Sequence, residues 1–240
     1  MLSKKALSLA LAGSLVFPVG SAFASEEPTN LNEQISQYSP ELKKELQQAE
    51  IDTKTAAQKV NEINQEELNK ELEELKSNNP EKYQAIIKEK QKQKQKQKFA
   101  ASSGKMGTKG DILISYDNKT AGWNHGHAAI VLEDNNYYME AWPDRGVRVH
   151  DNDFGTRFNS KKKQYIKGAS NNQYRAAQNY AYSKKGSKYS VLTRKDNPYQ
   201  FYCSSLVWQA WKSQGYDLDS NGGGIVTPAD IDNSSYTITY

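Results

Sequence analysis

The composition of the chain changes abruptly near residue 98, and this change constrains the fold more than any other feature. Residues 26–98 contain no Trp, Cys, His, Phe or Gly and consist largely of Glu, Lys, Gln and Asn. All four Trp and all three His follow residue 98. Because a packed core needs aromatic and apolar side chains, the sequence predicts a charged extension over 25–98 and one compact domain over 99–240.

Residues 1–24 have the pattern of a secretory signal peptide. Lys4 and Lys5 precede an apolar stretch over 6–20, and Ala22-Phe23-Ala24 follows it. A short basic start, an apolar stretch and small residues around one larger residue are typical of cleaved leaders. We expect cleavage after Ala24 and a secreted protein, extracellular or associated with the cell wall. No later segment is apolar enough for a transmembrane anchor.

The extension is predicted to be α-helical. Leu68, Leu72 and Leu75 recur at helical spacing, and Pro40 and Pro80 each follow a residue suited to cap a helix. Two or three helices with narrow apolar stripes account for this pattern. They form either a small hairpin or a loose coiled segment.

Lysine alternates with Gln or Glu over 88–98, which predicts a linker or a solvated helix end. The extension as a whole fits a stalk, a wall-binding arm, a pro-segment or a solvated helix without chemistry. The net charge is +4, and two of these positive charges belong to the leader lysines. This balance is too weak to indicate a nucleic-acid partner.

Residues 99–240 alternate between strand-like and helical patterns. The fold class is predicted to be α+β, with an antiparallel sheet and packed helices. A long polar segment over 151–173 contains Lys161-Lys162-Lys163 and is interpreted as a lid or a substrate-facing loop. Strands are expected at 112–116, 127–132, 137–142 and around 147–149, and helices at 174–185, 204–214 and from Thr227 onward.

Cys203 is the single cysteine of the chain. In a secreted protein it has no disulfide partner within the chain, so it is either an inert buried thiol or a reactive one. It stands where an extended, proline-containing segment gives way to an amphipathic helix. Because a helix N-terminus stabilises a thiolate, Cys203 is a candidate nucleophile. Its neighbours Tyr202 and Ser204 are expected in the substrate or oxyanion vicinity, where Tyr202 either lines the site or simply packs.

A thiol nucleophile needs an imidazole, and a third group must orient that imidazole. In an antiparallel hairpin with an even-length loop, directly paired residues have numbers with an odd sum. His127 and Glu140 therefore share a face of the sheet. A tight turn at 133–134 places them directly opposite each other, whereas a turn at 135–136 offsets them along the strand. The sequence leaves this register open.

His125 is the alternative base, because it lies two residues before His127 on a segment with loop character. His150 is interpreted as a solvated strand residue. No residues have the spacing of a metal site, so we expect neither a metal nor another cofactor.

Five short motifs stand in a particular order: Gly110-Asp111-Ile112-Leu113, His127-Ala128-Ala129-Ile130-Val131, Met139-Glu140-Ala141, Tyr202-Cys203-Ser204-Ser205-Leu206-Val207-Trp208 and Thr227-Pro228-Ala229-Asp230-Ile231. This order resembles the circularly permuted branch of the NlpC-type papain-like hydrolases, the YiiX-like amidases, a branch that includes relatives of lecithin–retinol acyltransferase. The resemblance covers 109–231 and none of the extension. Ala129 departs from it, because the family usually has glycine there.

The resemblance implies a permuted papain-like domain with Cys203 as nucleophile, His127 as base and Glu140 as the residue that orients His127. The backbone N–H of Cys203 is a candidate oxyanion donor. The expected function is a secreted cysteine amidase that forms an acyl-enzyme, with cell-wall peptides as the substrate class. The alternatives are a lipid acyltransferase or esterase of the same fold and a non-catalytic cell-surface binding module.

Overall fold

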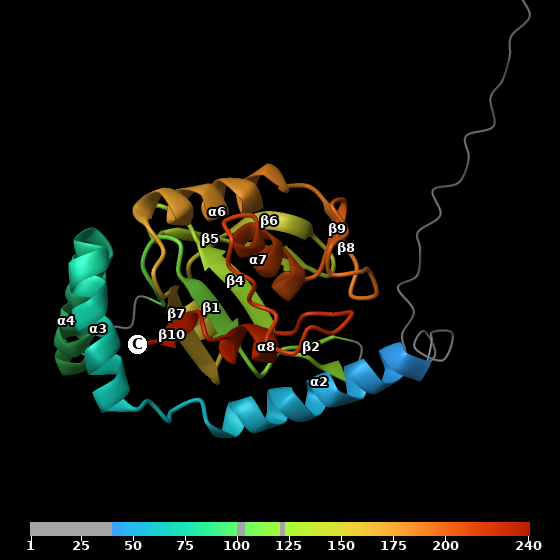
Figure 1. Cartoon of the computed structure of the whole chain (residues 1–240), viewed down its shortest axis with the longest axis horizontal. Helices are drawn as coiled ribbons and strands as arrows, with labels where there is room; N and C mark the ends of the chain where they lie inside the picture. Colours follow the sequence, from blue (N-terminus) through green and yellow to red (C-terminus); the bar gives the residue numbers. More distant parts are fainter. Residues whose placement is uncertain (1–39, 100–103, 121–122) are drawn as a thin grey trace, which may run out of the picture.

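The structure is a computed structural model that describes residues 40–99, 104–120 and 123–240 (Figure 1). The expected leader over 1–24 and its cleavage point lie outside the described residues. In the part of the chain described here, no helix has the combination of length and apolar character needed to cross a membrane.

A six-stranded antiparallel sheet forms the centre of the molecule, and helices pack around it (Figure 1). The strand order is β10-β7-β1-β4-β5-β6. This arrangement confirms the predicted α+β class. Its strands are β1 (Ile112–Ser115), β4 (His127–Val131), β5 (Tyr137–Trp142), β6 (Gly146–Asp151), β7 (Lys161–Ile166) and β10 (Thr237–Thr239), and two small two-stranded sheets comprise β2 (Lys119–Thr120) with β3 (Trp123–Asn124) and β8 (Lys188–Tyr189) with β9 (Gln200–Phe201).

Both faces of the sheet are covered, because apolar side chains alternate between them along each strand. Ala128, Ile130 and Met139 join the main core with the helices α6 (Asn171–Ser183) and α7 (Cys203–Lys212). The opposite face carries a smaller cluster that contains Val131 and Tyr138. The short helix α5 (Phe154–Arg157) contributes to that cluster.

Local signals place three helices of the domain, α6, α7 and α8 (Pro228–Asp232), close to where the sequence predicts them. The Ser170 side chain caps α6 and forms a capping box with Gln173. Thr227 forms the same kind of box with Asp230 at the start of α8. In α7, the apolar side chains of the expected amphipathic helix are buried, including Trp208 and Trp211.

Among the described residues, three helices precede the domain: α2 (Pro40–Gln58), α3 (Gln65–Asn78) and α4 (Pro80–Phe99). Two of them begin at the prolines identified in the sequence. The predicted Leu68, Leu72 and Leu75 stripe is buried in a cluster that also contains Tyr165 of β7 and the C-terminal Tyr240. The α3–α4 hairpin therefore packs against the β7–β10 side of the sheet, and α2 runs along the neighbouring side of the domain (Figure 1).

Residues 88–98 form the last part of α4, as in one of the two expected alternatives; residues 91–95 are exposed, whereas Glu89 is nearly buried. One segment differs from its sequence-based interpretation. The polar segment over 151–173 includes β7, so Lys161-Lys162-Lys163 belongs to the sheet and not to a lid. These lysines are accommodated because Lys162 pairs with Asp232 at 2.9 Å and Lys163 pairs with Glu89 at 2.8 Å.

Candidate active site

Cys203 is the first residue of α7, and the residue is 2% exposed. The backbone of Tyr202 is extended, and its N–H donates to Ser205 Oγ at 3.0 Å, which fixes the start of the helix. Helix α7 packs across β4 and β5. The thiol therefore lies at the N-terminal end of a buried helix, where the helix dipole favours a negative charge.

His127 and Glu140 are hydrogen-bonded, with 2.7 Å between His127 Nε2 and a carboxylate oxygen. The hairpin pairs Ile130 with Met139 and Val131 with Tyr138, so its turn is centred between residues 134 and 135. The turns at 133–134 and at 135–136 that were considered from the sequence would each shift the pairing of the two strands by two residues relative to this register. The two side chains share a face, as predicted, and they are offset along the strands.

Glu140 is held as a carboxylate by three cationic groups. Arg148 Nε donates to it at 2.8 Å and Arg157 donates at 2.9 Å, in addition to the His127 contact. Burial opposes ionisation, but the hydrogen bond and charge of His127, together with Arg157 and Arg148, lower the pKa of Glu140 to about 2. Glu140 is thus ionised at neutral pH and stabilises a protonated imidazole.

The His127 ring is packed on several sides by aromatic rings. Trp142 meets it edge-on at 5.1 Å between centroids, and Phe154 and Phe158 lie within 6.1 Å. Burial favours the neutral imidazole, yet hydrogen bonds to Cys203 and Glu140 raise the pKa of His127 above its ordinary value. Since Nε2 faces Glu140, Nδ1 is the ring nitrogen left for the thiol.

His125 is a second imidazole within hydrogen-bonding reach of the thiol. The two histidines are separated by Gly126, which has φ of +70° and whose Cα approaches Ser115 O so closely that a Cβ would collide with it. Burial alone would raise the pKa of Cys203, but the hydrogen bonds and charges of His125 and His127 lower it to about 5. The thiol is therefore largely a thiolate at neutral pH.

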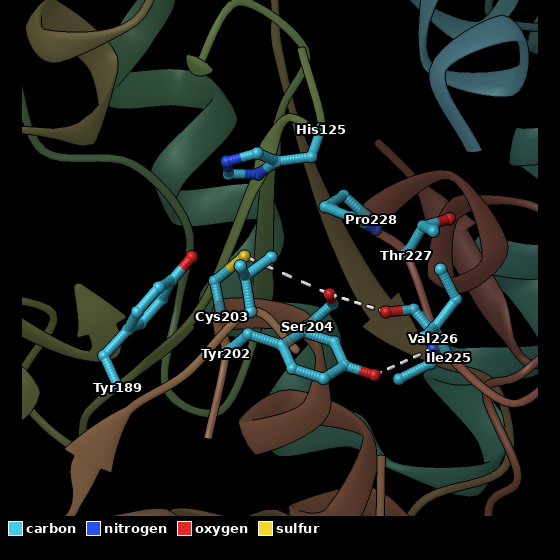
Figure 2. A pocket seen from close by; sticks show the side chains of 10 residues that line it. His125, Tyr189, Tyr202, Cys203, Ser204, Ile225, Val226, Thr227 and Pro228 are labelled. Carbon is cyan, nitrogen blue, oxygen red and sulfur yellow. Dashed lines mark hydrogen bonds between the residues drawn. The ribbon is translucent and has the colours of Figure 1, made fainter. Parts of the chain in front are cut away.

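A narrow pocket opens in front of the thiol, and Figure 2 shows the side chains around it. The cavity measures about 10 Å³, which is room for about one water molecule. Most of its lining is apolar, whereas His125 brings an imidazole into it. The lining residues are His125, Tyr189, Val191, Tyr202, Cys203, Ser204, Ile225, Val226, Thr227 and Pro228.

Tyr202 and Ser204 line this pocket, but their hydroxyl groups are engaged by the backbone of Val226 (Figure 2). Val226 N–H donates to Tyr202 Oη at 3.0 Å, and Ser204 Oγ donates to Val226 O at 2.8 Å. Both side chains therefore hold the pocket wall in place. The Cys203 N–H remains the candidate oxyanion donor at the helix start.

Arg148 and Arg157 are site residues that the sequence reasoning missed. Arg148 lies directly opposite Glu140 in the β5–β6 ladder, so the alternation around Val147 and Val149 was a usable signal. Arg157 comes from α5, in the segment interpreted as a loop, and nothing in its sequence context indicates its role. His150 is half-buried and stacks on Tyr138 at 5.3 Å between centroids.

Among the residues that the structure describes, no group of three or more His, Cys, Asp or Glu side chains is arranged to hold a metal ion. No cofactor is assigned to the site, and the expectation that none is needed stays a prediction.

No family model matches the chain. It is 34% identical over 154 residues to the uncharacterized protein YycO of Bacillus subtilis strain 168, an alignment that covers 58% of this chain and 59% of YycO. The chain thus aligns with about three fifths of that relative. It is also similar to the crystal structure of metalloprotein yiiX from Escherichia coli O157:H7, with a TM-score of 0.46 and 14% identity. That match covers 55% of this chain and 96% of the other.

Proposed function

We propose that this protein is a secreted cysteine amidase of the permuted papain-like type that cleaves peptides through an acyl-enzyme on Cys203. One observation carries the proposal: the Cys203 thiol lies at a helix N-terminus against His127, whose other ring nitrogen is fixed 2.7 Å from the buried Glu140 carboxylate. This arrangement supports the proposed roles of Cys203 as nucleophile, His127 as base and Glu140 as orienting group. Secretion and cell-wall peptides as substrates belong to the same proposal.

The arrangement supports a two-step acyl transfer. The Cys203 thiolate attacks the amide carbonyl carbon and forms a C–S bond, and the Cys203 N–H stabilises the oxyanion. Protonated His127 then gives its proton to the leaving nitrogen as the C–N bond breaks, which leaves a thioester. Neutral His127 next takes a proton from water, whose oxygen attacks the thioester and releases the acid and the thiolate.

Acyl transfer or ester hydrolysis on a lipid is the second candidate, because Val191, Ile225 and Val226 make the pocket mainly apolar. The same residues suit a small apolar group of a peptide, and a cavity of about 10 Å³ does not hold a long acyl chain in this conformation. Parallel assays on peptide amides and on short- and long-chain acyl esters separate the two candidates. A preference for long-chain esters would favour the lipid enzyme.

Alkylation of Cys203 by iodoacetamide tests the proposal without a known substrate. We expect rapid labelling at pH 6 in the wild type, because the thiol has its midpoint at about 5. His127→Ala should raise this midpoint and slow labelling at pH 6 by about tenfold or more, since each pKa unit by which the midpoint exceeds pH 6 lowers the thiolate fraction about tenfold. Glu140→Gln should cost less, because Glu140 orients the imidazole. A wild-type labelling midpoint in the ordinary thiol range would contradict an activated thiol.

His125→Ala is the matched comparison for His127→Ala. Both histidines lower the thiol pKa, so both variants should slow labelling at pH 6. Because His127 is hydrogen-bonded to Glu140, turnover should fall by roughly 10²-fold or more in His127→Ala and less in His125→Ala. Loss of turnover in His125→Ala with normal turnover in His127→Ala would reassign the base.

The dependence of kcat/KM on pH is expected to be bell-shaped. Activity should rise through about pH 5 as the Cys203 thiol ionises, and it should fall at alkaline pH as His127 loses its proton. The raised pKa of His127 places this alkaline limb above the ordinary histidine range. In Glu140→Gln the limb should move to lower pH, because the carboxylate no longer favours the imidazolium. An unmoved limb would show that Glu140 does not control the base.

A further inference from the structure

The wall of the Cys203 pocket formed by Ile225 to Thr227 is held by side chains and not by a β-ladder. The Gly224 and Ile225 N–H groups donate to Glu45 Oε2 at 2.9 and 3.1 Å. Val226 N–H donates to Tyr202 Oη, and Thr227 N–H donates to Asp230 Oδ2 at 2.8 Å. We call residues 224–227 the wall segment. Four successive backbone donors thus depend on α2, α8 and the residue before the nucleophile.

The outer side of the wall segment comprises Gly224 and Ile225. Their N–H groups are bound by α2, through Glu45, and not by α8 or Tyr202. A single carboxylate oxygen of Glu45 accepts both N–H groups, and the missing Cβ of Gly224 allows this approach, since a Cβ there would lie 3.1 Å from that oxygen. Ile225 packs against Leu46 and Ala49 of α2 and lines the pocket as well. One side chain therefore touches both the extension and the space in front of the thiol.

The inner side of the wall segment is fixed by the neighbours of the nucleophile. Tyr202 and Ser204 bind the two backbone polar groups of Val226, as Figure 2 shows. A cavity of about 10 Å³ is far below the several hundred Å³ that a ligand pocket usually needs. A substrate group must therefore displace part of the lining. The anchors of Val226 are the two residues that flank Cys203 in the sequence, so the Gly224–Ile225 side is the part that can move without disturbing the thiol.

We propose that α2 clamps the Cys203 pocket and that Glu45 is its positioning residue. Docked α2 holds Ile225 against the pocket and keeps it narrow, and release of α2 widens it. The clamp favours small groups in front of the thiol, because a larger group must break the Glu45 contacts before it can enter. The proposal concerns the pocket of the proposed amidase, but its test needs no turnover.

The test compares the alkylation of Cys203 by iodoacetamide and by a bulky fluorescein maleimide in Glu45→Ala and Glu50→Ala. Glu50 lies on the same helix and pairs only with Lys54 among the contacts described, at 2.9 Å, so its loss leaves the wall segment intact. We expect Glu45→Ala to speed maleimide labelling by about tenfold, since two charge-assisted hydrogen bonds are lost, and to speed iodoacetamide labelling much less. Glu50→Ala should match the wild type with both reagents.

Gly224→Ala provides an independent variant, because its methyl group presses on the Glu45 carboxylate. As a single substitution it should speed maleimide labelling relative to the wild type. Combined with Glu45→Ala it should give no further increase, since both changes act on the contact between Gly224 and Glu45. Equal maleimide rates in Glu45→Ala and Glu50→Ala would overturn the clamp, and so would an equal acceleration with both reagents. The pH midpoint of labelling should not move in either variant. A wild-type midpoint in the ordinary thiol range would count against the proposed amidase and not against the clamp.

Discussion

Replacement of Cys203 by alanine is expected to abolish amide hydrolysis, with a loss of roughly 10⁴-fold or more in kcat. The reason is that the proposed reaction passes through a thioester, and the pocket offers no second nucleophile in the same place. Ser204 Oγ lies 4.0 Å from Cys203 Sγ and already donates to Val226 O. Turnover of cell-wall peptides, followed by mass spectrometry of the released fragments, measures the loss. Mass spectrometry of the intact wild-type protein during turnover should show an acyl adduct on Cys203.

Two comparisons make this result specific. Cys203→Ser preserves the size and position of the side chain but has a far less acidic hydroxyl, so it should be nearly as inactive as Cys203→Ala. Ser204→Ala removes the hydrogen bond to Val226 and keeps the thiol, so it should retain most of the activity. Peptide binding that survives Cys203→Ala, without turnover in the wild type, would instead support the non-catalytic binding module.

That His127 and Glu140 share a face of the sheet could be predicted from the sequence, because side chains alternate between the two faces along a strand. Any even-length loop in this hairpin places both residues on one face, whichever register the turn selects. The register itself could not be predicted, because it depends on backbone conformations within the turn. Asn135 adopts a positive φ of 59° there, which a short polar side chain tolerates and which the sequence does not require.

The prediction from the sequence was wrong where contacts with distant residues outweigh the local preference for a loop. Lys161-Lys162-Lys163 reads as a polar loop, yet it forms β7 because Asp232 and Glu89 neutralise two of the lysines from distant elements. The helix starts at Pro40 and Pro80 were predictable, since they depend on a few neighbouring residues. Their docking was not, because it depends on contacts with residues far along the chain.

Lys82 provides the clearest example of such docking, because it is fully buried between α4 and the sheet. Its Nζ donates to Asp111 at 2.6 Å, to Thr108 Oγ1 at 2.8 Å and to Lys109 O at 2.7 Å, and it lies 4.3 Å from the centre of the Tyr174 ring. Burial disfavours its charge and lowers its pKa, while Asp111 favours the charge. The pair therefore couples the extension to the domain at its core.

We expect Lys82→Met to destabilise the whole chain by about 3–5 kcal/mol, because it leaves the buried Asp111 carboxylate without its cation. For a chain of this size this corresponds to a fall of roughly 10 °C in the melting temperature, measurable by circular dichroism. Lys82→Met combined with Asp111→Asn should recover part of the loss, since both charges are then absent. Lys76→Met is the control, because Lys76 is exposed and its pair with Glu73 at 3.5 Å contributes little.

The same contact bears on the predicted boundary near residue 99. A fragment over 99–240 loses Lys82 and also uncovers Tyr165 and Tyr240, which the α3–α4 hairpin buries. Because these effects act together, the fragment should be at least as unstable as Lys82→Met. Equal melting temperatures for Lys82→Met and Lys76→Met, with a fragment that melts like the full chain, would show that the extension is a separate unit. A large fall in the melting temperature of both Lys82→Met and the fragment would show that the extension completes the core of the domain whose pocket α2 is proposed to clamp.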